Sequence, residues 1–138
     1  MLVKNQWVKV TVLATFLAAL LLGTFMIAPA AHAKGGDATR IALTGSAQYP
    51  NAKGTAKYKA NGGEREFQVE LENAKSLAGK TVDVYANGAK AGSFKVTALG
   101  TGRLNRNTDL GQTVPMIRAG SAIQIKTRAG VIIVSGGF

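Results

Sequence analysis

Turn signals recur about every ten positions from Arg40 onward, and short runs that alternate apolar and polar residues fill the intervals. Each signal contains at least one glycine. They are Asn61-Gly62-Gly63, Ala78-Gly79, Asn87-Gly88, Gly100-Thr101-Gly102, Ala119-Gly120 and Ala129-Gly130. This spacing is typical of short antiparallel strands joined by tight turns, and it leaves no room for a long amphipathic helix. The pattern therefore predicts an all-β domain.

Eight segments carry the alternation. They are residues 40–44, 54–60, 65–71, 81–85, 92–99, 103–107, 122–127 and 131–135. This number of strands favours a single Ig-like antiparallel β-sandwich of seven to eight short strands over residues 40–138. One helical turn at most is expected, at residues 75–79. The chain has no cysteine, so its stability must come from packing and backbone pairing.

The second and third segments have one register that satisfies both faces of a hairpin. Tyr58 then faces Phe67 on the core side, and Lys59 faces Glu66 in solvent. Lys57 and Lys59 are therefore predicted to be cross-strand partners of glutamates rather than binding residues.

The fourth and fifth segments contain a conflict. Asn87-Gly88 favours a two-residue turn, but that register alone places the apolar residues of the two segments on opposite faces. A three-residue loop over residues 86–88, with Gly88 at positive φ, places them on one face. The four residues are Val82, Val84, Phe94 and Val96. Their burial is worth about 1.5–3 kcal/mol each, so we predict the three-residue loop.

Residues 131–134 are apolar on both faces, which predicts a central or covered strand. Ile123 and Ile125 are expected to lie on the strand paired with it. The connecting turn would be Arg128-Ala129-Gly130.

The first 33 residues differ in kind from the rest. Two lysines precede an apolar run over residues 10–28, and Ala31 and Ala33 place small residues where signal peptidase reads them. This predicts a helical secretory signal peptide cleaved after Ala33, a flexible leader over residues 34–39, and a periplasmic or extracellular destination. The run is also long enough for an uncleaved membrane anchor, which is the alternative.

Residue types exclude most catalytic chemistry. Cleavage after Ala33 removes His32, the only histidine, so thiol or histidine nucleophiles and metal sites built on these residues are excluded. Glu66, Glu70 and Glu72 share one face of a strand, which leaves a carboxylate-based small hydrolase as an alternative. The sequence otherwise predicts no catalytic residue, no metal and no cofactor.

Two other ligand classes have weak signals. Residues 105–111 alternate oxygen-bearing side chains like the opening of a calcium loop, but they hold one carboxylate and no closing Glu, so they predict a polar strand end followed by a turn. Nucleic-acid binding needs exposed aromatic residues beside cations. Only Tyr49 and Tyr85 are expected to be exposed, so no specific nucleic-acid binding is predicted.

The chain is strongly basic, with 17 Lys and Arg against 7 Asp and Glu. Asp109 is the only acid after residue 83, and hairpin packing is expected to gather the cations of this half at one end of the sandwich. The candidate anion contacts are Arg103, Arg106, Arg118, Lys126 and Arg128, with Lys80, Lys90 and Lys95 as weaker candidates. Such asymmetry suggests an anionic partner, and solubility alone is the alternative.

Turn and core residues also follow a characteristic order. It runs through Leu43-Thr44-Gly45, Gly54-x-Ala56-x-Tyr58, Phe67-x-Val69-x-Leu71-x-Asn73, Val84-x-Ala86-Asn87-Gly88 and Gly130-x-Ile132-x-x-Ser135-Gly136-x-Phe138. This order resembles that of a family of small exported bacterial β-sandwich domains of unassigned function. The resemblance implies the fold and no catalytic residues.

Together these features predict a non-catalytic exported binding or structural module that acts at the cell envelope or outside the cell. The expected partner is an anionic surface polymer or an envelope protein. An inhibitor or accessory subunit that presents the loop at residues 110–118 is a further alternative.

Overall fold

Eight antiparallel strands make up most of residues 38–138, the part of the chain that the computed structural model describes. They are β1 (Thr39–Gly45), β2 (Lys53–Asn61), β3 (Glu64–Glu72), β4 (Thr81–Ala86), β5 (Ala89–Lys95), β6 (Gly102–Asn107), β7 (Ala122–Thr127) and β8 (Ile132–Gly137). The predicted all-β antiparallel sandwich is confirmed. The predicted signal peptide, with Ala31 and Ala33, lies outside the described residues.

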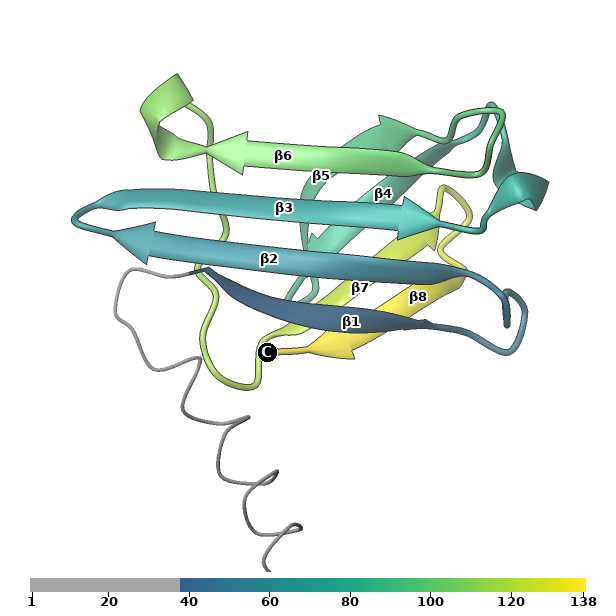
Figure 1. Cartoon of the computed structure of the whole chain (residues 1–138), viewed down its shortest axis with the longest axis horizontal. Coiled ribbons are helices and arrows are strands. Elements are labelled where there is room, and N and C mark those ends of the chain that lie inside the picture. Colours follow the sequence, from purple (N-terminus) through teal and green to yellow (C-terminus); the bar gives the residue numbers. More distant parts are fainter. Residues whose placement is uncertain (1–37) are drawn as a thin grey trace, which may run out of the picture. The chain divides into compact units, whose positions relative to one another are not determined.

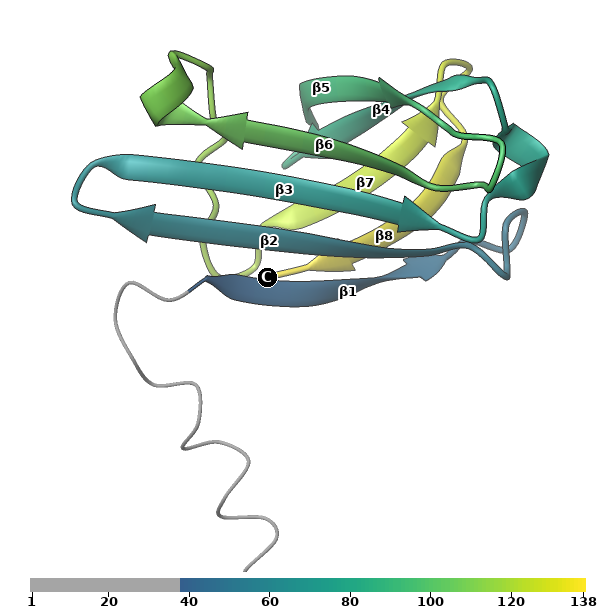
Figure 2. The same ribbon diagram turned by 45° about the horizontal axis from the view of Figure 1, so that its top comes forward.

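All eight strands belong to one sheet in the order β5-β4-β7-β8-β1-β2-β3-β6, and this sheet folds over into two layers (Figures 1 and 2). One layer holds β1, β2, β3 and β6, and the other holds β8, β7, β4 and β5. Only two residue pairs, Thr44 with Ser135 and Gly45 with Val134, join β1 to β8. At the other seam Phe94 of β5 lies against Gly102 of β6, so the sheet is nearly closed.

The core lies between the inner faces of the two layers. Its fully buried large side chains are Phe67, Val69, Leu71, Val82, Val84, Val96, Ile123, Ile125, Ile133 and Val134. In β3, β4 and β7 they alternate with polar residues, so each of these strands presents polar side chains on its other face. Ile133 and Val134 are sequence neighbours, and both are buried at the register shift between β7 and β8. No helix within residues 38–138 has the length and apolar character needed to cross a bilayer.

The β2–β3 hairpin has the predicted register. Tyr58 pairs with Phe67 and Lys59 pairs with Glu66. The predicted ion-pair ladder is wrong, however, because no carboxylate of the described residues lies within 4.0 Å of Lys57 or Lys59. Lys57 is opposite Gln68, and Glu70 forms its ion pair with Arg103 of β6 instead.

The β4–β5 hairpin corrects the predicted three-residue loop. Asn87 and Gly88 form a two-residue turn, with φ of 52° and 79°. The register then shifts at a β-bulge, because Tyr85 pairs with Lys90 whereas Val84 pairs with Gly92. This bulge restores the phase of the apolar residues. The predicted buried face is confirmed, since Val82, Val84, Phe94 and Val96 are all buried.

The fifth strand also ends earlier than predicted. It stops at Lys95, because Thr97 and Gly100 form a turn in which the Gly100 N–H donates to the Thr97 carbonyl at 3.0 Å. Gly100 has φ of 80°, a conformation that an extended strand does not contain. Leu99 is consequently exposed rather than part of a strand.

The last strand is central, as predicted. β8 lies between β7 and β1, and Ile125 of β7 pairs with Val134. The turn before β8 is closed by the Gly130 N–H, which donates to the Thr127 carbonyl at 2.9 Å. Because β8 pairs with a strand on each side, neither of its edges is left open.

Two short 3-10 helices complete the domain. η1 (Lys75–Leu77) is the predicted single helical turn. η2 (Thr108–Leu110) follows β6, and its first turn is capped by the Asn107 side chain, which accepts from the Asp109 N–H at 2.8 Å. Residues 105–111 therefore form the predicted polar strand end followed by a turn. The segment after η2 runs behind β3 and β2 in Figure 1 and buries Val114 and Ile117 against one end of the core.

Candidate functional site

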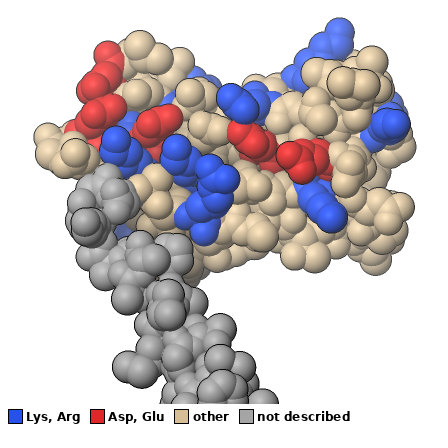
Figure 3. All heavy atoms as spheres, in the orientation of Figure 1, with Lys and Arg blue, Asp and Glu red and all other residues tan. Residues whose placement is uncertain are grey.

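The two outer faces of the sandwich carry different balances of charge. Strand register places five cations and four carboxylates on the outer face of β1, β2, β3 and β6. The cations are Arg40, Lys53, Lys57, Lys59 and Arg103, and the carboxylates are Glu64, Glu66, Glu70 and Glu72. Red and blue atoms interleave on this face in Figure 3. It is a nearly balanced surface.

The opposite outer face, formed by β5, β4 and β7, carries four cations and one carboxylate. The cations are Lys90, Lys95, Lys126 and Arg128, which we call the cationic face. The carboxylate is Asp83, which pairs with Ser93 on one side and Lys126 on the other. Since Asp83 is only 5% exposed, the surface that solvent meets on this face is cationic.

Asp83 forms the centre of the cationic face. Its Oδ1 accepts a hydrogen bond of 2.8 Å from Ser93 Oγ, and it lies 3.2 Å from Lys90 Nζ and 3.6 Å from Arg128 Nε. Burial raises the pKa of Asp83, but the Ser93 hydrogen bond and the charges of Lys90 and Arg128 outweigh burial and hold the pKa below its ordinary value. Asp83 is therefore ionised and fixes two cations in place.

The other two cations of this face are differently held. Lys126 Nζ lies 4.8 Å from the centroid of the Tyr85 ring, a cation–π contact across the outer face. Within residues 38–138 no carboxylate lies within 4.0 Å of Lys126 or Lys95. These two ammonium groups are the ones whose charge nothing in the described domain neutralises directly.

The structure does not bring the five predicted anion contacts together. Lys126 and Arg128 lie on the cationic face, with the weaker candidates Lys90 and Lys95. Arg103 is on the opposite face, where its Nη2 lies 2.8 Å from Glu70 Oε1. Arg118 is exposed in the loop before β7. The expected gathering of all five at one end is therefore wrong, and Arg103 and Arg128 have the acidic partners that the sequence did not indicate.

Arg106 has a different environment from the other four. The register of β6 against β3 places it on the inner side, opposite Phe67, where a neighbouring position is occupied by Arg65. The Nε atoms of both arginines are buried, and neither has a hydrogen-bond partner among the described residues. Arg65 Nη1 contacts Met116 Sδ at 4.0 Å. Arg106 is thus partly enclosed by the protein and is not part of a surface cluster.

The glutamates of the hydrolase alternative lie on one face, as their spacing indicates. Glu70 accepts from Arg103 and, at 2.6 Å, from Gln68 Nε2. Both contacts are made to Oε1 of Glu70, which is the arrangement of an ion pair between strands rather than of a general acid or base. Among residues 38–138 no group of three or more His, Cys, Asp or Glu side chains is close enough together to hold a metal ion.

Sequence reasoning missed the central role of Asp83, Ser93 and Tyr85. The signal that could have found them is the alternation Val82-Asp83-Val84, which places a lone carboxylate on the outer face of a strand. The predicted exposure of Tyr49 and Tyr85 also needs correction, because both are half-buried.

Comparison of the chain with protein-family models, with curated proteins and with solved structures finds no match.

Proposed function

We propose that this chain is a non-catalytic binding module that acts at the cell envelope or outside the cell, and that its cationic face attaches it to an anionic surface polymer. The expectation of export rests on the charged, apolar and small-residue parts of residues 1–33. The expectation of an anionic partner rests on the distribution of charge over the sandwich.

One observation carries this proposal. Four cations share a face with one carboxylate, and that carboxylate is buried beneath them, whereas the opposite face is nearly balanced. A protein that needed charge only for solubility would gain nothing from collecting it on one face. An uncompensated cationic surface attracts polyanions over roughly a Debye length, about 8–10 Å at physiological salt.

The test compares two double variants of the full chain on an immobilised sulfated polysaccharide, eluted with a salt gradient. Lys95→Gln with Lys126→Gln removes two charges from the cationic face. Lys57→Gln with Lys59→Gln removes two charges from the balanced face and is the matched control. We expect the first variant to elute at clearly lower salt than the wild type, and the control to elute close to the wild type.

Equal shifts for the two variants would mean that only net charge matters, and the proposal would fail. Thermal unfolding of both variants verifies that neither substitution acts through the fold. Binding to an acidic protein in place of the polysaccharide, with the same dependence on Lys95 and Lys126, would redirect the proposal to an envelope protein.

A second candidate function is favoured by the segment at residues 110–118. Leu110 and Met116 are 72% and 51% exposed, while Val114 and Ile117 of the same segment are buried and fix its path. Such a segment could present apolar contacts to a partner protein, as an inhibitor or accessory subunit would. Salt separates the two functions, because apolar contact tolerates salt and contact through the cationic face does not. The variant Leu110→Ser with Met116→Ser should weaken only binding of a partner protein through the apolar contacts of residues 110–118.

A further inference from the structure

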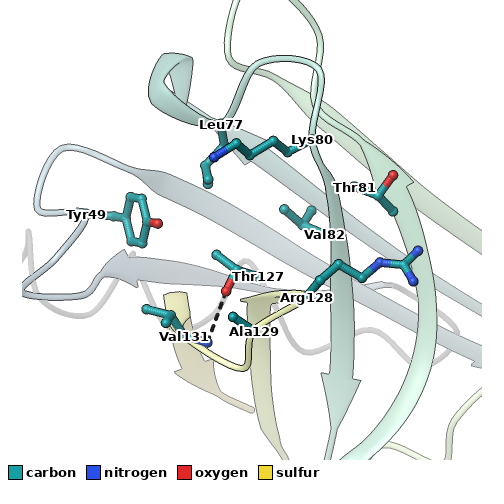
Figure 4. A pocket seen from close by; sticks show the side chains of 9 residues that line it. All are labelled: Tyr49, Leu77, Lys80, Thr81, Val82, Thr127, Arg128, Ala129 and Val131. Carbon is teal, nitrogen blue, oxygen red and sulfur yellow. Dashed lines mark hydrogen bonds between the residues drawn. The ribbon is translucent and has the colours of Figure 1, made fainter.

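A cavity of about 540 Å³ opens at the end of the sandwich where the β7–β8 turn lies (Figure 4). Three segments far apart in the sequence frame it. Tyr49 comes from the loop after β1, Leu77 and Lys80 come from η1 and the residues after it, and Arg128 and Ala129 come from the β7–β8 turn. This volume lies within the range of about 300–1,000 Å³ that is typical of small-molecule sites.

The floor of the cavity is apolar. Leu77 and Val82 are buried core residues that line the cavity, and Ala129 and Val131, which come from the turn between β7 and β8, continue the apolar lining. The Tyr49 ring stands across from them, with its hydroxyl directed toward the cavity in Figure 4. A ligand that fills this space must therefore present apolar atoms to most of the wall.

The polar groups at the rim are cations and hydroxyls. Figure 4 shows the Lys80 side chain lying along the rim with its ammonium group near Leu77, while the Arg128 guanidinium is directed away from the cavity. The Thr127 hydroxyl accepts from the Val131 N–H at 3.1 Å, which leaves its own proton available to a ligand. Among the residues that the structure describes, no Asp or Glu lines the cavity.

We propose that this cavity binds a small amphipathic anion, a carboxylate carried on a medium-length apolar chain. The apolar floor would hold the chain, and Lys80 with the Thr127 hydroxyl at the rim would hold the carboxylate. A neutral ligand would leave Lys80 unused, and a cation would meet only positive charge. This site goes beyond the cationic face, with which it shares only Arg128.

The test titrates the ¹⁵N-labelled full chain with hexanoate, octanoate and the uncharged octanol, followed by NMR. We expect octanoate to shift the amide signals of Leu77, Lys80 and Val131 and to leave those of β2 and β3 in place. Each methylene that enters the cavity should tighten binding about fourfold, so octanoate should bind about fifteenfold more tightly than hexanoate. Octanol should bind more weakly than octanoate. Shifts scattered over the surface, or affinity independent of chain length, would overturn the proposal.

Two pairs of variants make the test specific. Ala129→Trp places a large side chain at the mouth of the cavity, and Ala119→Trp places the same side chain in another exposed turn as the control. Only the first should abolish octanoate binding. Lys80→Ala should weaken octanoate by about twofold to fivefold and leave octanol unchanged, since an exposed ion pair is worth that much. Lys95→Ala, an exposed cation away from the cavity, is the control, and an equal loss with it would contradict a role for Lys80.

Discussion

Ser93 Oγ donates a hydrogen bond of 2.8 Å to Asp83 Oδ1 across the β4–β5 pair. This contact holds the one carboxylate of the cationic face in an orientation that Lys90 and Arg128 can both reach. A buried carboxylate in a sheet would ordinarily destabilise the fold. Here it has a hydroxyl donor and two cations, so its charge organises the surface above it.

We expect Asp83→Asn to lower the free energy of unfolding at pH 7 by about 1–3 kcal/mol, because both ion pairs are lost and the Ser93 hydroxyl then donates to a neutral group instead of a charged one. The folded state lowers the pKa of Asp83, so the stability it adds is complete above the ordinary aspartate pKa of about 3.9. That stability is lost as the pH falls through the lower pKa of the folded state. Urea unfolding from pH 7 to pH 2 should show the difference between wild type and variant shrinking on acidification. A constant difference would show that the charge of Asp83 plays no part.

Gly88→Val should destabilise the domain by about 1–3 kcal/mol, because residue 88 has φ of 79° and a β-branched side chain is strained there. A Cβ added at this position meets no other atom within 4 Å, so the expected cost comes mainly from the backbone conformation. The neighbouring exposed Ala89→Val, in an extended strand, is the control and should change stability by about 0.5 kcal/mol or less. Thermal or urea unfolding measures both. Similar stability for the two variants would show that the turn relaxes freely.

Gly102→Ala should cost about 1–3 kcal/mol by overpacking, since a Cβ at Gly102 would overlap the Phe94 ring at the seam between β5 and β6. Gly137→Ala is the control, because a Cβ there meets only the Ser121 carbonyl oxygen at an ordinary 3.7 Å. Urea unfolding should therefore separate the two variants. If Gly102→Ala were as stable as Gly137→Ala, the Phe94 ring could adopt another rotamer, and the contact between β5 and β6 would be less tightly packed than the structure indicates.

The mature protein should begin at Lys34, because residues 31–33 carry the small-residue pattern of a signal peptidase site. Intact mass of the protein recovered from the periplasm or the medium tests this. Ala31→Arg should block processing and leave the precursor. A mass that still includes residues 1–33 in the wild type would favour the membrane anchor instead.

The sequence predicted the number of strands, their antiparallel pairing and their approximate bounds, because the alternation of apolar residues and the turn residues reflect short-range conformational preferences. The β4–β5 hairpin shows where this reasoning stops. Without a bulge, Asn87-Gly88 and the apolar pattern of Val82 and Phe94 predict contradictory registers. The chain keeps both by inserting a bulge between Tyr85 and Gly92, a feature that no short-range signal in these residues specifies.

The candidate site was less accessible to prediction for a related reason. Arg103 and Glu70 are 33 positions apart in sequence, and Asp83 and Arg128 are still more distant, so counting acids near each cation along the chain missed both pairs. Ion pairs form between neighbouring strands of the sheet that are far apart in the sequence. Which cations remain uncompensated therefore depends on sheet order, which the alternation of apolar residues leaves open.

The short junction between β1 and β8 has a consequence for the timing of folding. The first strand of the domain completes its pairing only beside the last one, through Thr44 with Ser135 and Gly45 with Val134. Until residues 132–137 are present, β7 and β1 both have open edges, and no strand pairing joins the two layers on that side. During synthesis or export the sheet therefore stays incomplete until the last strand is available. The pairing of β8 with β1 then joins residues from nearly opposite ends of the domain sequence in one late step.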